Sequence, residues 1–131
     1  MDIFKAFATD ETKETQGAWF DVPGGDARVL VARSTIQKYS KAVLEAYEKY
    51  AKADKNSEET RKQQEADFDR VIAQHLLLGW QKVEYKGKPM EYSVENACTL
   101  LAHRDFRTFI QKCADDFEAY RAEIEEHVGN S

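Results

Sequence analysis

Residues 18–32 read AWFDVPGGDARVLVA and contain the clearest fold signal in the chain. Two short apolar segments, residues 18–22 and 27–32, flank the sequence Pro23-Gly24-Gly25-Asp26. Proline fixes the backbone angle φ and glycine tolerates positive φ, so this composition predicts a turn between two strands. A two-stranded hairpin alone is marginally stable in water, and we therefore expect the hairpin to pack against helices.

Helical periodicity follows the hairpin. The sequence Ser34-Thr35-Ile36-Gln37 fits a capping box and predicts a helix that begins at Ser34 and runs to about Ala53. A polar break at residues 54–57 precedes a second helix from about Glu58. The first half of that helix is almost wholly charged or polar, so we expect it to project into solvent. Gly79 is a suitable residue for the C-terminal end of this second helix.

The period changes between Trp80 and Tyr92, where an ordered turn or a short hairpin is expected. Ser93 is the N-cap of a predicted third, short helix, and Arg104-Asp105 separates it from a fourth. The fourth helix ends in an acidic segment, residues 123–126. Its apolar stripe is predicted to comprise Phe106, Phe109, Ile110, Cys113, Phe117, Tyr120 and Ile124.

These elements together predict an α+β fold, mostly α, in which an N-terminal β-hairpin is followed by about four helices. We expect one small domain over residues 1–131, with the hairpin at 18–32 and a helical body at 34–127. Residues 1–16 show no sustained period and are expected to be weakly ordered. The 131 residues are 42% hydrophobic, which is enough for one packed core.

Charge and hydropathy exclude several classes of partner. The formal net charge is -5, which disfavours nucleic-acid binding through a broadly basic surface. No apolar run approaches the ~18 residues needed to span a bilayer. The first residues do not form a basic segment followed by an apolar one, so we expect no secretory signal and a location in the cytoplasm.

Residue patterns typical of catalysis or metal binding are missing from the sequence. The three histidines, at positions 75, 103 and 127, lie far apart, and the two cysteines, at 98 and 113, form no CxxC pair. Adjacent carboxylates such as Asp115-Asp116 are typical of solvated helix faces. We therefore expect no catalytic, cofactor-binding or metal-binding residues, and no enzymatic activity.

Three aromatic residues are candidates for protein interaction. Trp80, Tyr85 and Tyr92 flank a turn instead of filling a helical stripe. Exposed aromatic residues on turns are frequent anchors in protein interfaces. The alternative is that Trp80 closes the core beneath the third and fourth helices.

A family resemblance rests on the order of several short motifs. Residues 80–101 read WQKVEYKGKPMEYSVENACTLL, and residues 106–117 read FRTFIQKCADDF. A Trp, a Gly-x-Pro turn, an aromatic-Ser cap, a Glu-Asn-Ala-x-x-Leu-Leu helix and a Phe-Arg-x-x-Ile helix follow one another. This order resembles the tail assembly chaperone family of long-tailed, siphovirus-type bacteriophages. The hairpin leading through Arg33-Ser34-Thr35 into a helix is also similar, so the resemblance spans about Phe4 to Phe117.

The resemblance implies a non-enzymatic role in the host cytoplasm during phage assembly. Such proteins bind the tape-measure protein, keep its long helical chain in solution and help to recruit tail-tube subunits. They are not expected in the mature virion. The resemblance also allows self-association. No binding site is carried over residue by residue.

Two further functions stay open on the sequence alone. The chain could be a structural component of the tail, or a small regulatory module that binds a host protein through its acidic helices. Its presence in finished virions distinguishes the first of these from a chaperone. A specific partner in uninfected host lysate distinguishes the second.

Overall fold

The computed structural model describes residues 1–54 and 56–123, and it confirms the predicted α+β, mostly α, class. In chain order the elements are α1 (Ile3–Ala6), α2 (Glu11–Gln16), β1 (Ala18–Asp21), β2 (Arg28–Val31), α3 (Gln37–Lys49), α4 (Glu58–His75), β3 (Leu77–Gln81), β4 (Glu84–Tyr85), β5 (Lys88–Pro89), α5 (Val94–Leu101), α6 (Arg104–Asp115) and the 3-10 helix η1 (Phe117–Tyr120).

The predicted hairpin is confirmed and is part of a larger sheet. Strand β1 pairs antiparallel with β2, with Ala18 opposite Val31 and Asp21 opposite Arg28. Strand β3 pairs antiparallel with the other edge of β2, which makes β2 the central strand in the order β1-β2-β3. The hairpin is therefore stabilised by a third strand as well as by helices.

The expectation that the second helix continues to Gly79 is wrong. Helix α4 ends at His75, and the next residues form β3. Leu77 pairs with Val31 and Gly79 with Leu30, so Leu78 is the extra residue of a β-bulge. The bulge lets Leu77 and Trp80, three residues apart, both reach the buried face. That spacing imitates one face of a helix, which explains the error.

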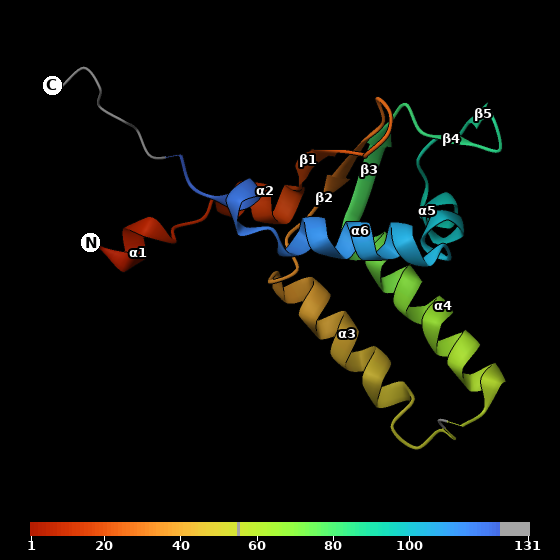
Figure 1. Cartoon of the computed structure of the whole chain (residues 1–131). Helices are drawn as coiled ribbons and strands as arrows, with labels where there is room; N and C mark the ends of the chain where they lie inside the picture. Colours follow the sequence, from red (N-terminus) through yellow and green to blue (C-terminus); the bar gives the residue numbers. More distant parts are fainter. Residues whose placement is uncertain (55, 124–131) are drawn as a thin grey trace, which may run out of the picture.

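The core lies between the sheet and the helices α4, α5 and α6, which Figure 1 shows gathered around β2 and β3. Fully buried side chains alternate along β2 because successive residues of a strand point to opposite faces. The largest fully buried aliphatic side chains come from β2, β3, α5, α6 and the C-cap of α4: Val29, Val31, Leu76, Leu77, Leu101 and Ile110.

Helices α3 and α4 leave this core as a pair that projects away from the sheet (Figure 1). Ser57 is the N-cap of α4, and its hydroxyl oxygen accepts from the Thr60 backbone N–H at 3.3 Å. At the end of α3, Asp67 of α4 accepts from Lys49 at 2.8 Å and from the Tyr50 hydroxyl. The first half of α4 is mostly exposed, as its polar sequence predicts.

The predicted capping box at Ser34 is not formed. Helix α3 begins at Gln37, and its N-cap, Ile36, makes no side-chain capping bond. The Ser34 hydroxyl instead donates to the Asp115 carboxylate, and the Ser34 backbone N–H donates to the Ala114 carbonyl at 3.0 Å. A tertiary contact with the end of α6 has replaced the local cap. The helix also stops at Lys49, before the predicted Ala53.

The fourth predicted helix is also shorter than its stripe suggests. Helix α6 ends at Asp115, and Asp116 takes an extended conformation that starts η1. This break turns Tyr120 inward, where it is fully buried and its hydroxyl donates to the Val31 carbonyl at 2.7 Å. Ile124 and the acidic residues 125 and 126 lie outside the described residues.

Residues 1–16, expected to be weakly ordered, contain two short helices with aspartate N-caps. Asp2 accepts from the Lys5 N–H, and Asp10 accepts from the N–H groups of Thr12 and Lys13. The Asp10 N–H donates to the Tyr120 carbonyl at 2.8 Å, which attaches this segment to η1. These helices depend on caps and on a distant contact, neither of which produces a hydrophobic period.

Gly17 connects α2 to β1 in a conformation that few other residues adopt. Its φ is +96°, and a Cβ there would lie 2.9 Å from the Leu30 side chain. We expect Gly17→Ala to lower the free energy of unfolding by about 1–3 kcal/mol, through backbone strain and crowding. Urea denaturation checks this. Gly25→Ala is the matched control, because a Cβ at Gly25 meets nothing within 4 Å; equal losses in both variants would contradict the prediction.

Candidate protein-binding groove

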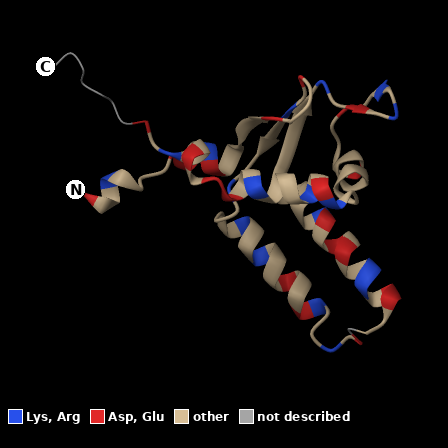
Figure 2. Ribbon diagram, viewed as in Figure 1, with Lys and Arg blue, Asp and Glu red and all other residues tan. Residues whose placement is uncertain are grey.

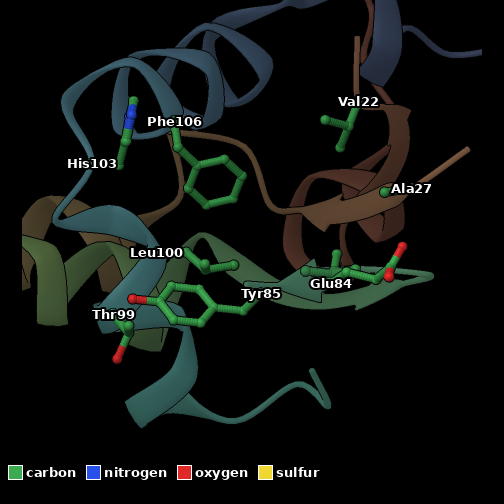
Figure 3. Close-up of a pocket in the computed structure, with 9 residues that line it drawn as sticks. Val22, Ala27, Glu84, Tyr85, Thr99, Leu100, His103 and Phe106 are labelled. Carbon is green, nitrogen blue, oxygen red and sulfur yellow. The ribbon is translucent and has the colours of Figure 1, made fainter. Parts of the chain in front are cut away.

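An open apolar groove of about 530 Å³ lies between the hairpin, the β4–β5 ribbon and helices α5 and α6 (Figure 3). Figure 3 shows Tyr85, Leu100 and Phe106 on one side of the groove, with Val22 and Ala27 on the opposite side. The lining comprises Val22, Ala27, Val83, Glu84, Tyr85, Thr99, Leu100, His103 and Phe106.

The ribbon wall is fixed by a tight turn and by a buried indole. Lys86 and Gly87 have φ values of 51° and 80°, the two positive angles of a type I′ hairpin turn. The Met90 N–H donates to the Val83 carbonyl at 2.9 Å. Trp80 then donates from Nε1 to the Met90 carbonyl at 2.7 Å, which holds the ribbon against β3.

The helical wall is fixed by caps and by an ion pair. Ser93 is the N-cap of α5 and accepts from the Asn96 N–H at 3.0 Å, which confirms its predicted role. Arg70 on α4 pairs with Glu95 on α5, with 2.9 Å between Nη1 and Oε1. These contacts fix the helix that presents Thr99 and Leu100 to the groove.

The structure separates the three predicted interaction residues. Trp80 is 9% exposed and packs edge-to-face on Tyr92, with ring centroids 5.1 Å apart. The Tyr92 hydroxyl donates to the Leu77 carbonyl at 2.7 Å. Both rings therefore support the groove from within the protein, and Trp80 closes the core. Tyr85 lines the groove and is 37% exposed. Contact of any of the three with a partner stays a prediction.

Charge is sparse inside the groove and mixed at its rim. Of the described residues that line it, Glu84 has the one formal charge when His103 is neutral. Lys86 and Lys88 extend from the adjoining ribbon, and Figure 2 shows acidic and basic residues side by side there. Such a site can bind an apolar helix face or side chain and select its orientation by a small number of charges.

Titratable groups with shifted pKa values lie outside this groove and have structural explanations. Burial raises the pKa of Asp69, although Arg107 contacts both of its carboxylate oxygens, at 2.6 and 3.0 Å. Burial raises the pKa of Cys113 to about 12 and also raises that of Cys98, so neither thiol is activated as a nucleophile.

The described part of the chain contains neither a metal-binding cluster nor a membrane-spanning helix. No group of three or more His, Cys, Asp or Glu residues there is arranged to hold a metal ion. Among the helices of residues 1–54 and 56–123, none combines the length and the apolar character needed to cross a membrane.

A model of the YdaY prophage protein family matches residues 33–130, which is most of the chain. The chain belongs to the YdaY prophage protein family. No curated protein and no solved structure matches it. The match covers α3 to α6 and seven of the nine residues that line the groove; Val22 and Ala27 of the hairpin lie before it. This YdaY-family protein is therefore phage-related.

Sequence reasoning assigned most of the groove to other roles. Leu100 and Phe106 fit apolar helix stripes, and Val22 and Ala27 fit the hairpin, so none of them was a candidate for binding. Side chains at the margin of a stripe follow the same periodicity as buried ones. Only the packing of α5 and α6 decides which of them stay accessible.

Proposed function

We propose that this prophage protein is a tail assembly chaperone that binds the tape-measure protein through the groove between β4–β5, α5 and α6. The observation that carries the proposal is an apolar groove supported by the same motifs, residues 80–101 and 106–117, on which the family resemblance rests. The groove would take the apolar face of one client helix. Membership of a prophage protein family supports a phage partner.

The surface suits a protein that keeps an apolar client in solution. Binding through a groove needs apolar contact area at the client and charged surface elsewhere. The projecting half of α4 is exposed and charged, and the whole chain has a net charge of -5. Like charges on neighbouring complexes repel one another, which opposes aggregation.

The role requires no bond to be made or broken. The tail-tube protein is a second proposed partner, recruited once the tape-measure chain is bound. We place the activity in the host cytoplasm during assembly and expect the protein to be absent from finished virions. Mass spectrometry of virions tests this point, since abundant chain in the particle would favour a structural tail component.

Thr99→Arg is expected to abolish client binding without unfolding the protein. Thr99 is exposed on the groove wall, so a long cationic side chain there would occupy the space and make the groove polar. In co-expression with a tape-measure fragment, wild type should raise the soluble yield of the fragment and co-purify with it. The variant should lose at least 80% of that effect, a loss of about 1 kcal/mol in binding free energy or more.

The matched control is Thr108→Arg, which makes the same change at an exposed position of α6 outside the groove. It should behave as wild type. If wild type neither solubilises nor co-purifies with the fragment, the chaperone proposal fails. If both variants bind equally well, the client uses another surface.

A further inference from the structure

Helix α1 presents an apolar face that the described structure leaves mostly exposed. Ile3, Phe4 and Phe7 lie one helical turn apart or adjacent, so they share one side of the helix. Phe4 is 91% exposed and Ile3 is 57% exposed. Phe7 touches the body through Phe117, with ring centroids 5.3 Å apart. We call residues 1–7 the arm.

The base of the arm is held firmly, and it points away from the body. Thr9 forms a β-bridge with Arg121, and the Ala122 N–H donates to the Ala8 carbonyl at 2.9 Å. Figure 1 shows α1 at one end of the molecule and the β4–β5 ribbon at the other. The arm therefore lies far from the groove of its own chain.

The arm and the groove have complementary apolar and charged groups. The groove offers Leu100, Phe106 and Tyr85 as apolar contacts and Glu84 as its charged lining residue. The arm carries Lys5 next to Phe4, with Asp2 one turn earlier. Lys5 can pair with Glu84 while Asp2 meets the ribbon lysines, Lys86 or Lys88. Figure 2 shows acidic and basic residues at both ends of the molecule.

We propose that the arm of one copy docks in the groove of a second copy, with Phe4 inserted and Lys5 beside Glu84. The contact is head-to-tail, so successive copies can form short chains or rings. The arm has only residues 1–7 to contribute, against about 20–30 residues a side in a standard protein interface, so association should be weak and dependent on concentration. The inference does not rest on the identity of any client.

Sedimentation velocity of the full chain over a wide concentration range tests the proposal. Wild type should shift to larger species as its concentration rises. The double variant Ile3→Ser/Phe4→Ser should remain monomeric, because both side chains are exposed and their loss does not disturb the core. A monomeric wild type at every concentration, or a double variant that associates like wild type, would overturn the proposal.

A charge exchange tests the orientation. Lys5→Glu and Glu84→Lys should each weaken association at least threefold, and the double variant Lys5→Glu/Glu84→Lys should regain most of the loss. Lys52→Glu, an equal charge change at an exposed position away from both surfaces, is the control. Failure of the exchange to restore association would contradict the Lys5–Glu84 contact.

A peptide assay identifies the surface that receives the arm. A labelled peptide of residues 1–8, MDIFKAFA, should bind the full-length Ile3→Ser/Phe4→Ser variant, whose grooves are free. Adding Thr99→Arg should reduce binding at least fivefold, whereas adding Thr108→Arg should not. Binding unaffected by Thr99→Arg would overturn the proposal. Since no tape-measure protein is present, failure here leaves the chaperone proposal to its own test.

Discussion

Arg107→Ala should lower the free energy of unfolding by about 3–5 kcal/mol, the usual cost of leaving one member of a buried ion pair alone. Asp69 is 5% exposed on α4, and the Arg107 guanidinium on α6 contacts both of its carboxylate oxygens. The variant leaves a charged carboxylate without a partner in the interior. Urea denaturation monitored by circular dichroism gives the loss.

The pH dependence of that loss follows from the Asp69 pKa. Burial raises this pKa above its ordinary value of 3.8 even with Arg107 present. A raised pKa means that the folded state binds the proton more tightly than the unfolded state does. The resulting stabilisation is complete below the unfolded pKa and is lost as the pH rises through the folded one. Without Arg107 the folded pKa rises further, so the deficit of the variant should be largest at pH 7 and smaller near pH 4.

Two controls separate charge from packing in this prediction. Arg107→Met keeps an apolar stem of similar length and removes only the guanidinium. Asp69→Asn/Arg107→Met removes the buried charge as well, and it should regain at least half of the stability that Arg107→Met loses. If the deficit of Arg107→Ala does not change with pH, the unpaired carboxylate is not its cause.

Trp80→Ala should destabilise the protein by about 3–5 kcal/mol, the range for deleting a large buried aromatic side chain. The indole fills space beneath the ribbon, packs on Tyr92 and donates to the Met90 carbonyl. Its loss leaves a cavity and an unpaired carbonyl group. The midpoints of thermal and urea unfolding should both fall strongly. The β4–β5 wall of the groove should also become less ordered.

Tyr85→Ala is the comparison that tells a core role from a surface role. Tyr85 is on the β4–β5 ribbon, next to β3, and lines the groove, so its removal should change stability by no more than about 0.5 kcal/mol. The stability loss of Trp80→Phe should fall between those of Trp80→Ala and Tyr85→Ala, because phenylalanine keeps most of the ring volume and loses the hydrogen bond. If Trp80→Ala keeps its stability, the core role assigned to the indole is wrong.

Part of the candidate site could be predicted from the sequence, and the rest depended on the tertiary structure. The turn between Trp80 and Tyr92 stood out in the sequence because its aromatic residues break the helical period. The sequence did not tell which rings face inward. The Trp80 indole donates to the Met90 carbonyl and the Tyr92 hydroxyl donates to the Leu77 carbonyl, so both rings face the interior. Tyr85 instead lines the groove.

Local chemistry in the sequence determined the hairpin, the cap at Ser93 and the polar half of α4, because turn residues, N-caps and side-chain polarity act over a few positions. Tertiary structure alone decided the features that depend on distant partners. Leu77–Gln81 became a strand because β2 offered a free edge and a bulge aligned Leu77 with Trp80. The Ser34 hydroxyl donates to the Asp115 carboxylate instead of capping α3. Tyr120 left its helical stripe because the Val31 carbonyl, 89 residues away, accepts its hydroxyl.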